Sequence, residues 1–202
     1  MTPPAEDQSE ATVAVNTGPS VCPVAGAARD LTLGGLFGAL AIVLPIVFHA
    51  VGMGKVFLPM YLPILALGLL ASWRTAALVG LLVPLISAIL TGMPPLAPPI
   101  AFIMMAELAA LGLIASVARS VGLGIWLAAV LGLLAARAVG VLALLTIGRA
   151  LGYEQGLYEF AVAGFVASWP GIALQLTVVP SAVYLIERTS IFGRPARGMR
   201  CV

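Results

Sequence analysis

Long apolar runs, separated by short polar links, dominate the chain. Six of these runs are predicted as helices, at residues 31–51, 56–73, 75–92, 98–118, 122–148 and roughly 160–186. A helix crosses the hydrocarbon core of a bilayer with about 20 predominantly apolar residues. The runs lack the apolar–polar alternation of membrane-barrel strands, so the pattern predicts an all-α protein with six transmembrane helices.

Prolines mark the irregular places in this pattern. The link "GMPPLAPP" after the third run cannot continue a helix, because proline lacks the backbone donor and clashes with the preceding turn. Pro59 and Pro63 interrupt the start of the second run, so that helix is expected to begin later than residue 56. Prolines inside other runs, such as Pro84 and Pro180, predict kinks that neighbouring helices can accommodate.

The polar residues gather at the two ends of the chain. Residues 1–30 are rich in Pro, Ala, Ser and Thr and predict a disordered N-terminal tail without the apolar run of a signal peptide. Residues 31–188 form the predicted transmembrane domain, and residues 189–202 a basic C-terminal tail. Cys22 and Cys201 lie in the tails and provide no disulfide framework.

Composition places this pattern in a membrane. The chain has 202 residues, of which 61% are hydrophobic and 9% charged, whereas soluble domains carry about 25% charged residues. Its basic residues are too scattered to indicate nucleic-acid binding. The net charge of +2 does not by itself favour one class of protein over another. We therefore expect a polytopic membrane protein.

The distribution of Lys and Arg predicts the orientation. If the N-terminus lies inside, only Lys55 and Arg149 fall in outside loops. The inside loops and tails then hold Arg29, Arg74, Arg119, Arg188, Arg194, Arg197 and Arg200. This asymmetry predicts that both termini are cytoplasmic, with Trp73 and Trp126 near the inner interface.

Two charges interrupt the apolar interior. Glu107, in "AFIMMAELAALG", lies on the fourth predicted helix, and Arg137 lies at a similar depth on the fifth. A charge at the bilayer centre costs at least about 2.5–3.5 kcal/mol, so such residues usually face the bundle interior and pair or bind something polar. Three interpretations remain open: an ion pair that only fixes helix packing, a site for a polar solute, or separate pairing with backbone or water.

Other side chains supplement this candidate site. His49, Lys55, Tyr61 and Trp169 are the further candidates for contact with a solute. A lone histidine without cysteine or a second histidine in the membrane does not support a metal site, and we expect no cofactor. We also expect no enzyme, because the chain has no convincing catalytic cluster, and no ATP hydrolysis of its own, because it has no nucleotide-binding motif.

Small residues recur at intervals of four on two predicted helices. On the first helix they form the pairs Gly34 and Gly38, and Gly35 and Ala39. On the fifth helix they form the stripe Ala128, Gly132, Ala136 and Gly140. Such stripes permit close helix approach, either within the bundle or, for the first helix, against a partner protein.

The combined pattern resembles the substrate-binding S components of energy-coupling factor (ECF) transporters. The segments that carry the resemblance are "GKVFLPMYLPILALGLL", "ALVGLLVPLISAILTGMPPLAPP" and "MMAELAALGLIASV", within roughly residues 30–188. The resemblance implies capture of a vitamin or vitamin-like micronutrient outside the plasma membrane. It also implies delivery inward with a transmembrane coupling subunit and two cytoplasmic ATPase subunits.

The resemblance also implies roles for particular residues. Small residues of the first helix would contact the coupling subunit, and Gly34, Gly35, Gly38 and Ala39 match that spacing. Residues 51–61 match the position of a lid over the substrate. Glu107, Arg137 and Trp169 occupy suitable positions for the substrate site, while the start "MTPP" lacks the histidine of metal-uptake members. An accessory membrane subunit without a small-molecule substrate is the alternative.

Overall fold

Every element that the structure describes is a helix. The computed structural model describes residues 21–50, 59–92, 94, 100–148, 150 and 169–189. The elements are α1 (Val21–Ala50), α3 (Tyr61–Leu70), α4 (Trp73–Thr91), α5 (Ile100–Val121), α6 (Ile125–Ala143), the π-helical turn η1 (Leu144–Gly148) and α8 (Trp169–Arg188). Five of these helices are long and apolar enough to cross a membrane, and α3 is a shorter apolar helix. The prediction of an all-α polytopic membrane protein is confirmed.

The first helix begins ten residues earlier than predicted. α1 starts at Val21, so residues 21–30 are helical and do not belong to a disordered tail. The charged residues near its start are held by the turn between α3 and α4: Arg29 donates to the carbonyl of Leu70 at 3.2 Å, and Asp30 accepts from the amide of Ser72 at 3.2 Å. These tertiary bonds oppose the disorder that composition alone predicts. Residues 1–20 lie outside the described part.

The second helix, α3, is shorter than the apolar run at residues 56–73. α3 begins at Tyr61, as Pro59 and Pro63 lead one to expect, and it ends at Leu70 rather than at residue 73. Ala71 and Ser72 are extended, and α4 then begins at Trp73. The start of the sixth predicted helix, near residue 160, lies outside the described residues, within which α8 begins at Trp169.

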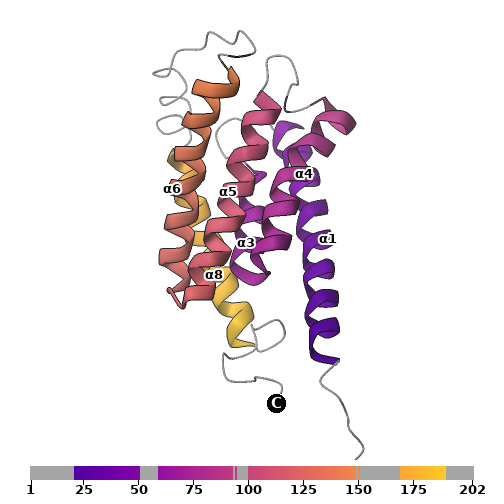
Figure 1. Ribbon diagram of the computed structural model, residues 1–202, viewed down its shortest axis with the longest axis vertical. Helices are drawn as coiled ribbons and strands as arrows, with labels where there is room; N and C mark the ends of the chain where they lie inside the picture. Colours follow the sequence, from indigo (N-terminus) through magenta and orange to yellow (C-terminus); the bar gives the residue numbers. More distant parts are fainter. Residues whose placement is uncertain are drawn as a thin grey trace, which may run out of the picture.

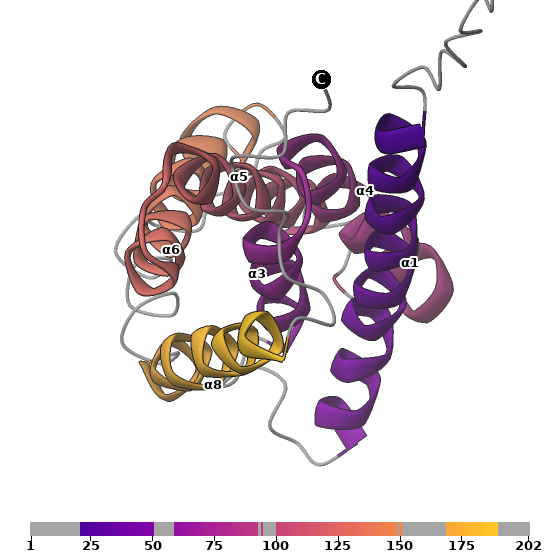
Figure 2. The ribbon, with the colours of Figure 1, turned by 90° about the horizontal axis from the view of Figure 1, so that it is seen from below.

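The short α3 occupies the middle of the bundle. It contacts α1, α4, α5, α6 and α8, and most of its side chains are buried (Figures 1 and 2). α4, α5 and α6 pack against one another in sequence, whereas α1 packs on one side against α3 and α4. α8 closes the bundle against α3 and α6. The core therefore surrounds a helix that is only ten residues long.

Glycines bring α4, α5 and α6 close together. A methyl group on Gly112 of α5 would lie 2.6 Å from the carbonyl oxygen of Ala76 on α4. One on Gly132 of α6 would lie 3.1 Å from both the Leu111 carbonyl oxygen and the Ala115 side chain of α5. The small-residue stripe of the fifth predicted helix is buried throughout, so its role in internal packing is confirmed.

α1 begins and α8 ends at the same end of the bundle (Figure 1). Near the helix termini at this end lie Arg29, Arg74, Arg119 and Arg188, and we call it the basic end. Trp73 and Trp126 lie there half-exposed, and the Arg74 guanidinium carbon lies 5.2 Å from the centre of the Trp73 ring. The basic end corresponds to the inner face predicted from the charges.

Apolar side chains also cover much of the outside of the bundle. The exposed ones on the outward helix faces include Leu31, Leu36, Val43, Leu78, Ile89, Leu127, Leu134, Leu142, Val178 and Leu185. A surface of this kind is suited to hydrocarbon rather than to water. The bilayer is therefore the environment of the folded chain.

Candidate functional site

Three of the predicted site residues meet in the interior. Tyr61 donates its hydroxyl to Oε2 of Glu107, and the same oxygen lies 3.7 Å from a terminal nitrogen of Arg137. The Arg137 guanidinium carbon lies 5.0 Å from the centre of the Tyr61 ring, which is the geometry of a cation–π contact. Glu107 is 2% exposed, Arg137 7% and Tyr61 1%. We call these three residues the buried cluster.

The lengths of the helices bring the cluster together. Glu107 is the eighth residue of α5, and Arg137 is the thirteenth residue of α6. At about 1.5 Å per residue, each lies roughly 20 Å from the basic end of its helix. Tyr61 is the first residue of α3, about 14 Å from that helix's last residue. The depth match of Glu107 and Arg137 was predictable, but Tyr61 was expected in an outer lid and instead lies in the core.

Glycine 140 makes room for the carboxylate. A methyl group placed on Gly140 would overlap Oε1 of Glu107, so the carboxylate lies directly against the α6 backbone. Oε1 is buried and has no hydrogen-bond partner among the described residues. Leaving a buried polar atom unbonded costs about 1–3 kcal/mol, and more for a charged group. The cluster is therefore closely packed, but one carboxylate oxygen of Glu107 forms no hydrogen bond with the described residues.

Gln175 adds a further buried polar group on α8. Its side chain is fully buried, and neither its Oε1 nor its Nε2 has a hydrogen-bond partner in the described part of the chain. Buried amides are nearly always hydrogen-bonded, so an unsatisfied one calls for an explanation. Gln175 was not among the predicted site residues, although its position as an amide within an apolar run was the signal that could have found it.

A cavity lies between parts of α6 and α8, next to the buried cluster. It has a volume of about 140 Å³ and is not fully enclosed. Its walls are Val130, Leu133, Leu134 and Arg137 from α6, and Ile172 and Leu176 from α8. Among the described residues that line the cavity, Arg137 is the charged one. The Arg137 side chain thus contacts Glu107 and Tyr61 and also forms part of the cavity wall, which is almost entirely apolar.

The other predicted contact residues lie elsewhere. Trp169 is the first described residue of α8, is 67% exposed, and does not line the cavity. Gln175, six residues further along α8, lies about 20 Å from Arg188 at the basic end, close to the depth of Arg137. His49 lies in the last turn of α1, but its side chain is outside the described part, as is Lys55. Solute contacts of these three residues stay predictions.

The two small-residue pairs of α1 face different ways. A methyl group on Gly34 would lie 3.0 Å from Thr75, and one on Gly38 would lie 3.3 Å from Val79, both on α4. These two glycines therefore serve internal packing, which corrects their expected availability to a partner. Gly35 and Ala39 are exposed, and a methyl group on Gly35 would meet nothing within 4 Å. Only this second pair is open to a partner.

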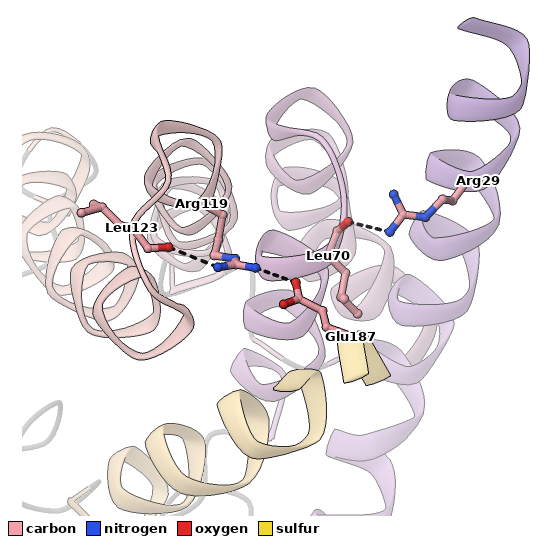
Figure 3. Close-up of polar contacts among 5 residues, drawn as sticks. All are labelled: Arg29, Leu70, Arg119, Leu123 and Glu187. Atoms are coloured by element: carbon pink, nitrogen blue, oxygen red, sulfur yellow. Dashed lines mark hydrogen bonds and ion pairs between the residues drawn. The ribbon is translucent and has the colours of Figure 1, made fainter. Parts of the chain in front are cut away.

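A second polar region connects the helices at the basic end. Arg119 of α5 bonds Glu187 of α8 at 2.6 Å and the Leu123 carbonyl at 3.2 Å, while Arg29 of α1 caps Leu70 of α3 (Figure 3). Ser116 of α5 donates to the carbonyl of Ala71 at 2.8 Å. We call this set the polar clasp. Its contacts satisfy the backbone groups freed where α3 ends.

The buried cluster consists of groups that form strong hydrogen bonds. A cation, a carboxylate and a phenol in a region without bulk water form strong, directional hydrogen bonds with a polar solute. Comparison of the chain with models of known protein families, with curated proteins and with solved structures finds no match.

Proposed function

We propose that the chain is the substrate-binding S component of an ECF-type importer in the plasma membrane, with a vitamin or vitamin-like micronutrient as its solute. The single observation that carries the proposal is the double role of Arg137. Its guanidinium contacts Glu107 and Tyr61 inside the bundle, and its side chain is one of those that line the cavity between α6 and α8. A buried cation beside a cavity provides an anchor for the polar part of a solute.

The arrangement of the helices supports the same proposal. The described chain enters and leaves at the basic end, as in a bundle with both termini in the cytoplasm (Figure 1). α1 packs on one side of the bundle against α3 and α4, and its face around Gly35 and Ala39 is exposed. This face has room for the close approach of a coupling-subunit helix. Because no family match supports the resemblance, the proposal depends on these geometric features.

In the proposed mechanism the solute binds from outside among α5, α6 and α8. Arg137 and Glu107 form charge-assisted hydrogen bonds to it, and Tyr61 keeps the carboxylate in place. The loaded chain docks through the Gly35 and Ala39 face on a transmembrane coupling subunit. Two cytoplasmic ATPase subunits then supply the energy for release inside, because the chain has no nucleotide-binding motif of its own.

Mass spectrometry of the small molecules that copurify with the full-length protein tests the proposal. We expect a retained micronutrient that raises the thermal stability of the protein and that drives ATP-dependent uptake in cells with the partner subunits. Glu107→Gln and Arg137→Ala should insert normally but lose the solute. Arg119→Ala, which alters a partly exposed pair at the basic end, is the matched control and should retain it. Unchanged retention in both cluster variants would remove the cluster from the site.

One observation favours a second candidate, an accessory membrane subunit without a solute. Tyr61, Glu107 and Arg137 contact one another, so the cluster also has a structural use. In that case no small molecule copurifies, and a panel of vitamins leaves the melting temperature unchanged. A ligand present at about 100 times its dissociation constant would instead add roughly 2.7 kcal/mol of stability.

A further inference from the structure

We infer that the cavity between α6 and α8 binds the end of a lipid acyl chain from the surrounding bilayer. This inference goes beyond the proposed function and does not depend on which micronutrient the protein takes up. Four features of the cavity carry it: the chemistry of its wall, its depth in the membrane, its opening and its volume.

The wall of the cavity is almost entirely apolar. Apart from Arg137, the described residues that line it are valine, leucine and isoleucine. Because polar atoms contribute so little to the wall, the part of Arg137 that lines it is chiefly the aliphatic stem, which long basic side chains commonly pack along apolar surface. A buried water needs about two to four polar partners, whereas apolar cavities stay dry and take up hydrocarbon. The wall therefore selects a hydrocarbon group.

The cavity lies near the middle of the membrane. On α6 its lining residues, Val130 to Arg137, lie about 8–18 Å from Ile125 at the basic end of the helix. On α8, Leu176 and Ile172 lie about 18 and 24 Å from Arg188 at the same end. The hydrocarbon core of a bilayer is about 30 Å thick, and the ends of its acyl chains meet at its centre. Chain ends are therefore the lipid groups at the depth of the cavity.

The opening of the cavity reaches the outside of the bundle at Leu134. This residue lines the cavity and is 57% exposed, and Val130, Ile172 and Leu176 in the same wall are only partly buried. Both helices belong to segments that are long and apolar enough to cross a membrane. Leu131, beside the opening on α6, is likewise exposed and apolar. A chain end therefore reaches the cavity from the hydrocarbon without passing a polar layer.

The volume of the cavity fits one chain end. At about 140 Å³ it is close in size to an engineered apolar cavity of about 150 Å³ that binds benzene. A chain segment of about six carbons fills the same space, while the rest of the lipid stays in the bilayer. The chain end supplies dispersion contacts that the wall lacks beside empty space. It also packs against the stem of Arg137 and so covers the buried cluster on its lipid side.

Photolabelling of the full-length protein in phosphatidylcholine nanodiscs tests the inference. One phosphatidylcholine probe carries a diazirine at the end of an acyl chain and a second carries it next to the headgroup, and mass spectrometry locates the labelled residues. We expect the chain-end probe to label Leu133, which lines the cavity and is buried from the surrounding lipid. The headgroup probe should not label Leu133, and neither probe should label Leu108, which is buried but does not line the cavity. Absence of label on Leu133 with the chain-end probe, while exposed Leu142 is labelled, would overturn the inference.

Substitutions that fill the cavity show whether the chain end enters it. Leu176→Trp and Val130→Phe each place a larger side chain in the wall, on α8 and α6 respectively, and both should abolish the labelling of Leu133. Two variants on different helices keep the test informative if one of them fails to fold. Leu142→Trp adds the same bulk at an exposed position of α6 that does not line the cavity, and it should leave the labelling intact. Unchanged labelling of Leu133 in a folded cavity-filling variant would overturn the inference.

The outcomes also separate this inference from the proposed function. Labelling of Leu133 in a protein that retains no micronutrient and drives no ATP-dependent uptake would support the acyl-chain site and contradict the importer. A retained micronutrient whose binding requires Arg137, without labelling of Leu133, would support the importer and overturn the acyl-chain site.

Discussion

The molecule holds its helices together with two polar regions of opposite character. In the polar clasp at the basic end, Arg119 and Glu187 meet at 2.6 Å, and their side chains are 16% and 24% exposed. In the buried cluster, Arg137 and Glu107 approach only to 3.7 Å, and their side chains are 9% and 3% exposed. The more deeply buried ion pair therefore has the longer distance between its charged atoms.

The two regions also differ in how many of their buried polar atoms form hydrogen bonds. In the clasp, both terminal nitrogens of Arg119 are bonded, although its Nε is buried without a partner in the described part of the chain. In the cluster, Glu107 Oε1 is unbonded among the described residues, and a cavity lined in part by Arg137 lies alongside. A region built only to fix packing would resemble the clasp. The cluster instead combines an unbonded carboxylate oxygen with a neighbouring cavity, and this combination supports the proposed binding role.

The largest contrast is expected between two arginine substitutions. Arg137→Ala leaves Glu107 as an uncompensated buried charge and should lower the free energy of unfolding by about 3–5 kcal/mol. Arg119→Ala breaks a partly exposed pair and should cost about 1 kcal/mol or less. Unfolding in detergent, followed by circular dichroism during an SDS titration, measures both. Equal costs would mean that the two regions have the same structural role.

Gly140→Ala tests the fit of the carboxylate against α6. The added methyl group would overlap Glu107 Oε1, so the carboxylate must move away from Tyr61 and Arg137. We expect a loss of stability of about 2 kcal/mol from overpacking, together with weaker solute binding. Gly35→Ala is the control, because a methyl group there meets nothing within 4 Å and alanine is the better helix former. Normal stability and solute binding in Gly140→Ala would show that the close packing of the Glu107 carboxylate against Gly140 is not needed for either property.

Tyr61→Phe separates the hydroxyl from the ring. The variant loses the hydrogen bond to Glu107 but keeps the aromatic face beneath Arg137, so we expect a cost of about 1.5 kcal/mol. Tyr184→Phe, at a half-exposed position on α8, is the matched control and should change stability little. Thermal unfolding of both variants measures the difference. If the two behave alike, the Tyr61 hydroxyl contributes nothing to the cluster.

The smallest effect is expected in the clasp. Ser116→Ala removes the donor to the Ala71 carbonyl and should cost about 1 kcal/mol while leaving the dissociation constant of the solute unchanged. Ser120→Ala, whose exposed hydroxyl bonds its own helix, should cost less. Paired unfolding and binding measurements check this. Weakened solute binding in Ser116→Ala would extend the site to the basic end.

The sequence predicts the long helices well because each apolar run is long enough to identify by itself. α4, α5 and α6 begin and end within a few residues of the predicted runs. The short α3 and the early start of α1 are less predictable, since both depend on tertiary bonds at the α3–α4 turn. Hydropathy reports the preference for lipid but not the contacts that end a helix or extend it.

The candidate site could be predicted only in part for the same reason. Glu107 and Arg137 stand out as charges in apolar runs, and helix rise places them at similar depth. The third member, Tyr61, depends on where α3 begins, and the packing of Glu107 against Gly140 depends on how α5 and α6 are rotated. Helix rotation within a bundle is set by packing between neighbours, which a single sequence does not reveal.

The most direct test of the central claim is a comparison of solute affinity between the two polar regions. The dissociation constant of the copurifying solute should be measured by isothermal titration calorimetry for the wild type, Arg137→Ala and Arg119→Ala. Loss of the anchor should weaken binding by at least about 100-fold in Arg137→Ala, equivalent to about 2.7 kcal/mol, while Arg119→Ala stays within about twofold of the wild type. Equal affinities for all three proteins would contradict the assignment of the buried cluster as the binding site.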